Sequence, residues 1–87
     1  MISKFISIKN RMLLARRLKE NDYKFRMHGY EYYIRKTKFV SILTLNPLWN
    51  LATIYKIRWN LKESEEAIKD LTKILKEIDS ELHIQIL

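Results

Sequence analysis

The sequence predicts a two-layer α+β domain: an N-terminal helix, a four-stranded antiparallel meander and a long C-terminal amphipathic helix. Three observations predict it. Apolar residues recur at helical spacing over residues 3–20, polar and apolar residues alternate over residues 23–59, and a second helical pattern fills residues 60–82. Helices at both ends of an antiparallel sheet can cover one face and leave the other open. The length of 87 residues fits a single domain, residues 1–87.

The first segment, Ser3–Glu20, has the periodicity of a helix. Apolar residues recur every three or four positions from Phe5 onward. Ser3 is a candidate N-cap, because its hydroxyl can accept a hydrogen bond from a free backbone N–H. The pair Asn21-Asp22 is typical of a helix end and turn.

Four strands are expected between the helices. The alternation of side chains changes phase at turns, and Gly29 and Pro47 mark two of these turns. The third strand is apolar on both faces, as in a central strand. The predicted strands are Tyr23–Met27, Tyr30–Thr37, Lys38–Leu45 and Leu51–Trp59.

Alternation divides the strand residues between a face toward the helices and an outer face. The residues expected to face the helices are Tyr23, Phe25, Tyr30, Tyr32, Ile34, Tyr55, Ile57 and Trp59. The residues expected on the outer face are Lys24, Arg26, Glu31, Tyr33, Arg35, Lys56 and Arg58. Five of these seven are cations, so the outer face is expected to be strongly basic.

The last helix has the clearest sequence signals. Asn60 is a good N-cap, and Glu63 stands three residues later as in a capping box. An apolar stripe then runs from Leu61 to Leu82 and is long for so small a core, so it either packs only on its own sheet or also docks against a second copy of the chain as a homodimer. The tail, His83–Leu87, is either a short fifth strand or a frayed end.

Charge is distributed unevenly along the chain. The net charge is +7, with 17 basic and 10 acidic side chains. Residues 1–59 hold 13 of the basic and 3 of the acidic ones, whereas residues 60–87 hold 4 and 7. A basic surface attracts polyanions such as nucleic acid, an anionic membrane or an acidic protein surface.

Several function classes lack the residues that they need. The chain has no cysteine and a single glycine, so a thiol nucleophile, a cysteine zinc site and a glycine-rich phosphate loop are excluded. His28 and His83 lie far apart in the sequence, and the carboxylates cluster on one charged helix surface. We therefore predict no enzymatic activity, no metal and no cofactor.

The compartment follows from the same composition. The lack of cysteine and of a continuous apolar run near the N-terminus predicts an intracellular, cytoplasmic protein. The uncharged stretch Phe39–Tyr55 has 17 residues, the short limit for a membrane span, but Asn46, Pro47 and Asn50 would be unfavourable in lipid. A membrane-spanning role is therefore not expected.

The leading hypothesis is a small nucleic-acid-binding protein, with duplex DNA favoured over RNA. The outer-face residues Lys24, Arg26, Arg35, Lys56 and Arg58 would contact phosphates, and Tyr33 would stack on a base or pack on a sugar. The first helix would add further cations. These are Lys9, Arg16 and Arg17.

Other readings compete with nucleic-acid binding. In one, the chain is an inhibitor or adaptor, such as a viral or plasmid accessory protein, which docks on an acidic or nucleic-acid-binding surface of a larger protein. Trp49, in the loop after the third strand, would anchor such a complex, unless it folds back over the core. In another, residues 1–20 attach the protein to anionic lipid. Every cation named above also has the simpler role of a solvated surface charge.

Overall fold

A computed structural model describes residues 2–37, 39–59 and 61–87, with only the backbone described at residues 58, 59 and 61. The elements follow one another along the chain as two short 3-10 helices, two α-helices and five strands. They are η1 (Lys4–Ile6), α1 (Ile8–Glu20), β1 (Lys24–His28), β2 (Glu31–Lys36), β3 (Phe39–Asn46), η2 (Pro47–Trp49), β4 (Leu51–Trp59), α2 (Leu61–Ile78) and β5 (His83–Ile86).

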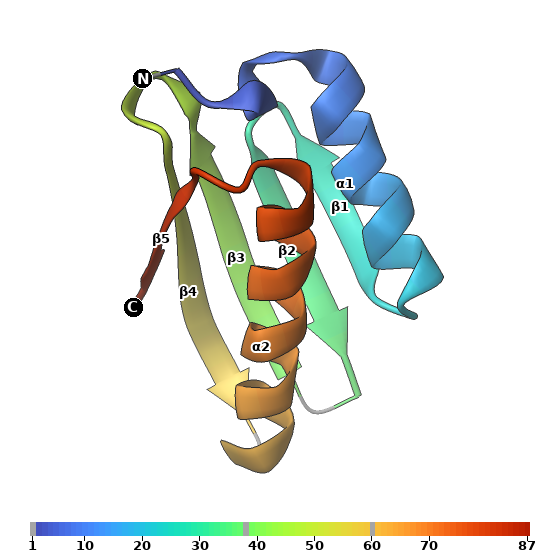
Figure 1. The fold of residues 1–87 in the computed structure, drawn as a ribbon. Helices are drawn as coiled ribbons and strands as arrows, with labels where there is room; N and C mark the ends of the chain where they lie inside the picture. Colours follow the sequence, from blue (N-terminus) through green and yellow to red (C-terminus); the bar gives the residue numbers. More distant parts are fainter. Residues whose placement is uncertain (1, 38, 60) are drawn as a thin grey trace.

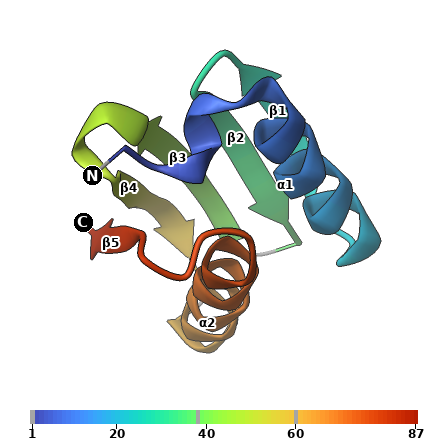
Figure 2. The same ribbon diagram turned by 45° about the horizontal axis from the view of Figure 1, so that its top comes forward.

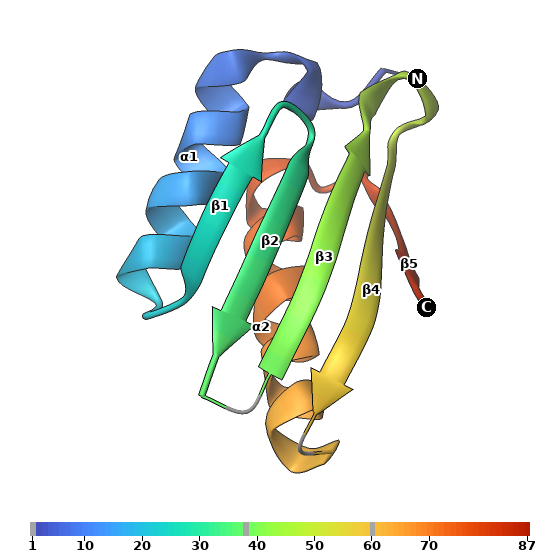
Figure 3. The same ribbon diagram turned by 180° about the vertical axis from the view of Figure 1, so that it is seen from behind.

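The two layers are a five-stranded sheet and a pair of helices. The strands lie in the order β1-β2-β3-β4-β5, with β1 to β4 antiparallel and β5 parallel to β4. Both α-helices lie on one side of this sheet (Figures 1 and 2), and the view from behind shows the strands in front of them (Figure 3). No described segment covers the outer face, the side of the sheet away from the helices. The predicted α+β class is confirmed.

The prediction of four strands is wrong by one. Residues after α2 form β5, whose ladder includes hydrogen bonds from the His83 N–H to the Asn50 carbonyl at 2.9 Å and from the Leu87 N–H to the Ile54 carbonyl at 2.9 Å. Parallel pairing needs a long crossover connection between the strands, and α2 supplies it. The predicted meander therefore ends in a β4-α2-β5 unit.

The first helix begins later than predicted. Ser3 caps η1, where its hydroxyl accepts a hydrogen bond from the Phe5 N–H at 3.1 Å. The α-helix starts only after Ser7, which has an extended backbone and accepts from the Lys9 N–H at 3.2 Å. A second serine in an N-cap conformation thus divides the predicted helix into η1 and α1.

Two residues with positive φ close the turns beside β1. Asp22 (φ 64°) follows α1, and the Tyr23 N–H donates to the Leu18 carbonyl at 3.0 Å, the pattern of a Schellman helix end. Gly29 (φ 59°) is the first residue of the two-residue loop that joins β1 to β2. A positive φ at that position is typical of a type II′ hairpin turn and favours glycine.

The predicted orientation of β4 is wrong at Tyr55, Lys56 and Ile57. Tyr55 pairs with Ile42 on the outer face, whereas Lys56 pairs with Ser41, which is buried on the helix side. Buried Ala52 and Ile54 fix this phase, because their side chains belong to the core beneath the helices. A register shift, in which Val40 pairs with residue 58 and Ser41 with Lys56, leaves Ile57 as an extra, exposed residue.

The apolar stripe of α2 is used within the domain. Ala67, Leu71, Ile74 and Leu75 are buried in the core between α2 and the sheet. The predicted start of the stripe, the side chain of Leu61, and the predicted N-cap, Asn60, lie outside the described residues. The exposed side chains on α2 are Lys62, Glu65, Glu66, Lys69, Asp70, Lys73, Lys76 and Glu77.

The uncharged stretch that spans residues 39–55 forms β3, η2 and the first half of β4. Its apolar residues alternate between the core and the outer face, as in a central pair of strands. Among the described residues, neither α-helix has the length and apolar character needed to cross a membrane.

A buried carboxylate joins the two ends of the fold. Asp79, which is 4% exposed, accepts hydrogen bonds from the Ser3 hydroxyl at 2.7 Å, the Lys4 N–H at 3.0 Å and the Glu81 N–H at 3.2 Å. The Ser3 N–H also donates to the Pro47 carbonyl at 2.7 Å. This Asp79 network fixes η1, η2 and the turn before β5 to one another.

Ser64 leads to a first testable prediction. It is 5% exposed within α2, and its hydroxyl has no hydrogen-bond partner among the residues that the structure describes. Ser64→Ala removes a buried unpaired hydroxyl and improves helix propensity, so we expect it to raise the free energy of unfolding by about 1 kcal/mol. For a domain of this size that raises Tm by about 4–8 °C, measurable by circular dichroism. Glu65→Ala, at an exposed position of the same helix, is the control; a Ser64→Ala variant less stable than the native chain would contradict the prediction.

Candidate nucleic-acid interface

The outer face carries its side chains in rows that cross the strands. Residues that are direct partners in neighbouring strands point to the same side of the sheet. One row, here called the cation row, contains Lys24, Arg35 and Val40. The next, here called the tyrosine row, contains Arg26, Tyr33, Ile42 and Tyr55. The third contains His28, Glu31, Thr44 and Thr53.

Three cations of β1 and β2 lie together on this face and form no ion pair within the described part of the chain. Lys24 and Arg35 are direct cross-strand partners, and Arg26 is the next outward residue along β1. All three are exposed, and none makes a hydrogen bond or ion pair with another described residue. Like charges directly opposite each other destabilise a sheet, so this pair lowers the stability of the free protein. An anionic ligand between the two side chains would remove that repulsion.

Two shallow hollows adjoin these cations. One, of about 340 Å³, extends over the outer face between Lys24, Arg26, Tyr33, Arg35 and Val40. The other, of about 470 Å³, lies at the end of β1 and β2 and is lined by Asp22, Lys24, Arg35, Lys36 and Thr37. Lys24 and Arg35 therefore border both hollows, which places positive charge between them.

Two tyrosines stand exposed in the tyrosine row. Tyr33 is 43% exposed and Tyr55 is 41% exposed, and both pair with Ile42, which lies between them on β3. The ring of Tyr33 also contacts His28, with 5.8 Å between ring centroids. Tyr33 was expected here from the sequence, but Tyr55 was not. Tyr55 lies on the outer face because Ala52 and Ile54 are buried on the helix side, and the sequence alone does not show that burial.

Lys56 does not belong to the outer face as predicted. Its partner in the sheet is Ser41, on the helix side, although its own side chain is exposed. The side chain of Arg58 lies outside the described residues, and its backbone pairs with Val40 of the cation row. The described part of the face thus contains three of the five predicted cations.

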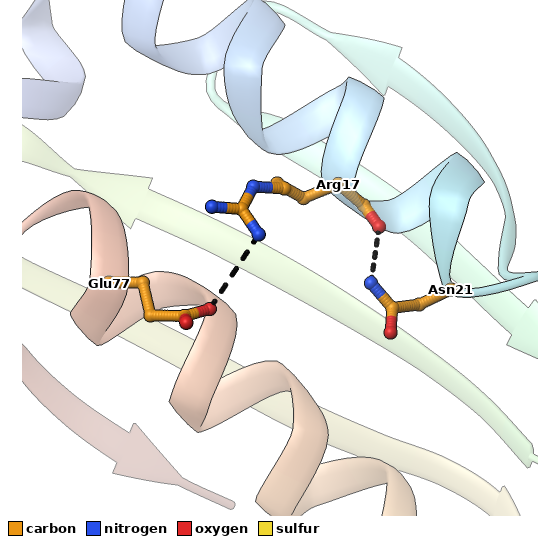
Figure 4. Close-up of polar contacts among 3 residues, drawn as sticks. All are labelled: Arg17, Asn21 and Glu77. Carbon is orange, nitrogen blue, oxygen red and sulfur yellow. Dashed lines mark hydrogen bonds and ion pairs between the residues drawn. The ribbon is translucent and has the colours of Figure 1, made fainter.

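The cations of α1 lie in the other layer. Lys9 and Arg16 are exposed on the helix, and α1 lies on the far side of the sheet from the outer face (Figure 3). Arg17 points toward α2, where its guanidinium lies 3.9 Å from a carboxylate oxygen of Glu77 (Figure 4). The Arg17 carbonyl accepts a hydrogen bond from Asn21 at 2.8 Å. The structure therefore divides the predicted site between two separate surfaces.

Arg11 has a structural role that the sequence analysis did not assign. Its guanidinium lies 4.2 Å from the centroid of the Tyr30 ring and donates to the Gly29 carbonyl at 3.2 Å. Its own carbonyl accepts a hydrogen bond from the Tyr32 hydroxyl at 2.7 Å. Arg11 thus attaches α1 to the β1–β2 hairpin and fixes the helix side of the two strands that carry the cations.

The buried tyrosines differ from those on the outer face. Burial raises the pKa of Tyr32 to about 12, against a smaller opposing effect of Arg11. Burial raises the pKa of Tyr23 well above its usual range. The carboxylate of Asp70, which accepts a hydrogen bond from the Tyr23 hydroxyl at 3.3 Å, raises this pKa further. Both side chains are neutral parts of the core at any physiological pH.

Exposed apolar side chains gather at one end of the sheet. Trp49, in η2, is 75% exposed, and Leu48 beside it is exposed too. η1 lies against η2 and also exposes an apolar residue, Ile6. Trp49 does not fold over the core, so the alternative of a buried lid is wrong. Among the described residues, no three histidine, aspartate or glutamate side chains come together as metal ligands would.

Comparison of the chain with protein-family models, with curated proteins and with solved structures finds no match to any of them.

Proposed function

We propose that the chain is a small, non-catalytic nucleic-acid-binding protein that uses the outer face of its sheet. The observation that carries the proposal is the cluster of Lys24, Arg26 and Arg35 beside exposed Tyr33, which no other described residue pairs with or covers. Cations contact phosphates, and an aromatic ring can stack on a base. A cluster of one sign is unusual for a surface whose only task is solubility, where both signs are normally mixed.

Electrostatic repulsion within the free protein supports the same proposal. Lys24 and Arg35 oppose each other directly, an arrangement that a purely structural sheet would avoid. A bridging phosphate turns this repulsion into two favourable contacts. The hollows on either side of the pair leave space for the sugar and the base that are attached to that phosphate.

The outer face alone is proposed as the contact surface. Lys9 and Arg16 face away from it on α1, and Arg17 is paired with Glu77. Nucleic acid on the outer face would feel these helix cations only through the long-range field of the protein, which is screened over about 8 Å at physiological ionic strength.

A salt titration tests the proposal. Fluorescence anisotropy of labelled single-stranded and duplex DNA should give micromolar or tighter binding at roughly physiological salt. The logarithm of the binding constant should fall linearly with the logarithm of the salt concentration, with a slope of about −2 to −3 for three phosphate contacts. Binding that appears only at low salt would sink the proposal, because any protein of this net charge would show it.

The exposed end of the sheet favours a second candidate function. Trp49 and Leu48 form an exposed apolar projection at the end of the sheet opposite the cation row, an arrangement suited to anchoring on another protein. This adaptor or inhibitor would form a stoichiometric complex with one protein and bind generic DNA weakly. Trp49→Ala distinguishes the two candidates, because it would weaken the protein complex and leave DNA binding on the outer face unchanged.

A further inference from the structure

The ligand class follows from the tyrosine row. We infer that the outer face takes single-stranded nucleic acid, with one base stacked on Tyr33 and another on Tyr55. This inference rests on the proposed function and narrows it. It depends on a feature that the sequence analysis did not anticipate, the outward position of Tyr55.

The sheet is too wide for its whole outer face to contact base edges in one groove of a DNA duplex. Adjacent strands are about 4.8 Å apart, so the outermost of five strands are about 19 Å apart. The major groove of B-DNA is about 12 Å wide and admits a two-stranded ribbon. Tyr55 lies on β4, three strands from β1, and cannot reach base edges while β1 and β2 occupy a groove. A single strand has no such limit, because its bases can turn their flat faces to the protein.

The spacing of the tyrosine row suits two separate bases. Tyr33 on β2 and Tyr55 on β4 are separated by β3, a distance of about 10 Å between strand axes. One base can lie on each ring, and Ile42 between them offers an apolar surface to the intervening sugar. Both rings are close to half exposed on a face that nothing described covers, so stacking requires no rearrangement of the fold.

The cation row lies where the phosphates would be. It is two residues along the strands from the tyrosine row, about 7 Å. A nucleotide whose base lies on Tyr33 would direct its phosphate toward Lys24 and Arg35, across the hollow that the three side chains share. Arg26 stands at the end of the tyrosine row beside Tyr33 and can contact the next phosphate.

Tyrosine substitutions with two oligonucleotides test the inference. The probes are a labelled oligothymidylate of about 12 nucleotides, within the range of known binding sites, and a hairpin duplex of the same length. At roughly physiological salt we expect the single strand to bind at least about tenfold more tightly than the duplex. Tyr33→Ala and Tyr55→Ala should each weaken single-strand binding about tenfold, with the salt slope unchanged. Tyr33→Phe should retain the affinity, because the ring remains.

Trp49→Ala is the matched control, since Trp49 is an exposed aromatic residue in η2, outside the tyrosine row. This substitution should change neither the affinity for the single strand nor the affinity for the duplex. Tighter binding of the duplex, with both tyrosine variants neutral, would overturn the inference and leave the proposed function intact, with the β1–β2 hairpin as the contact. No binding of either probe at physiological salt would overturn both. A thermal melt of each variant excludes unfolding as the cause of lost affinity.

Discussion

Replacing Lys24, Arg26 and Arg35 together with alanine is expected to lower the affinity for nucleic acid by about 100-fold or more at roughly physiological salt. Each contact between a cation and a phosphate releases counterions, so losing three contacts should also flatten the salt dependence by about two to three in slope. Folding should not suffer. The substitution removes the direct opposition of Lys24 and Arg35, and all three side chains are exposed. Anisotropy at several salt concentrations measures both effects.

The matched control removes the same charge from the other layer. Lys9, Arg16 and Lys19 are exposed on α1, so their triple alanine variant has the same net charge as the sheet variant. We expect it to bind within about fivefold of the native chain, since these side chains act only through the screened field. Equal losses in the two variants would show that net charge, and not the outer face, determines binding.

The second large effect concerns stability. Asp79→Ala should lower the free energy of unfolding by about 3 kcal/mol, because it leaves the buried Ser3 hydroxyl and two backbone N–H groups without their acceptor. In a domain of this size that lowers Tm by about 12 °C or more. Glu77→Ala, which breaks only the exposed pair with Arg17, should change stability by less than about 1 kcal/mol.

A double-mutant cycle isolates the Asp79 network. The two substitutions Ser3→Ala and Asp79→Ala should be non-additive by more than about 1 kcal/mol, because both remove the same 2.7 Å hydrogen bond. Additive losses in urea unfolding would mean that the carboxylate acts through some other contact.

The same network makes stability depend on pH at the acidic end. Burial alone would raise the pKa of Asp79, but hydrogen bonds from Ser3, Lys4 and Glu81 outweigh it and hold the pKa below the ordinary value of 3.8. A lowered pKa in the folded state means that the carboxylate stabilises the fold above pH 3.8. That stabilisation is lost as the pH falls through the folded-state pKa. Asp79→Asn should therefore flatten the acid limb of the stability profile.

The sequence contains most of the fold in local signals. Asn21-Asp22 and Gly29 mark turns that form where predicted, and the α+β class follows from the change of periodicity between helix and strand segments. It leaves residues 83–87 open between a fifth strand and a frayed end, because parallel pairing of residues 83–86 with β4 depends on a partner some 30 residues away and on the docking of α2. The helix start was misplaced because Ser3 and Ser7 are both competent caps.

The candidate site could be predicted where one face of a strand is polar. Lys24, Arg26, Tyr33 and Arg35 alternate with core residues, and the structure places all four on the outer face. In β4 the alternation of polar and apolar residues does not identify the outer face. Residues 51–57 are apolar or aromatic at both alternating sets of positions, apart from Thr53 and Lys56. There only packing decides, and the burial of Ala52 and Ile54 turns Tyr55 outward.

The Asp79 network also has a consequence for synthesis on the ribosome. The hydroxyl of Ser3 finds its acceptor only after residue 79 has been made, so this hydrogen bond is missing while most of the chain is being synthesised. Phe5, fully buried in the finished domain, belongs to the same core cluster as Leu75 and Leu82, so the core is incomplete during that interval. Any nascent fragment that stops short of residue 79 has an open core at one end. We therefore expect the domain to fold as one cooperative unit once its last helix has been made, because α2 contributes Ala67, Leu71, Ile74 and Leu75 to the core.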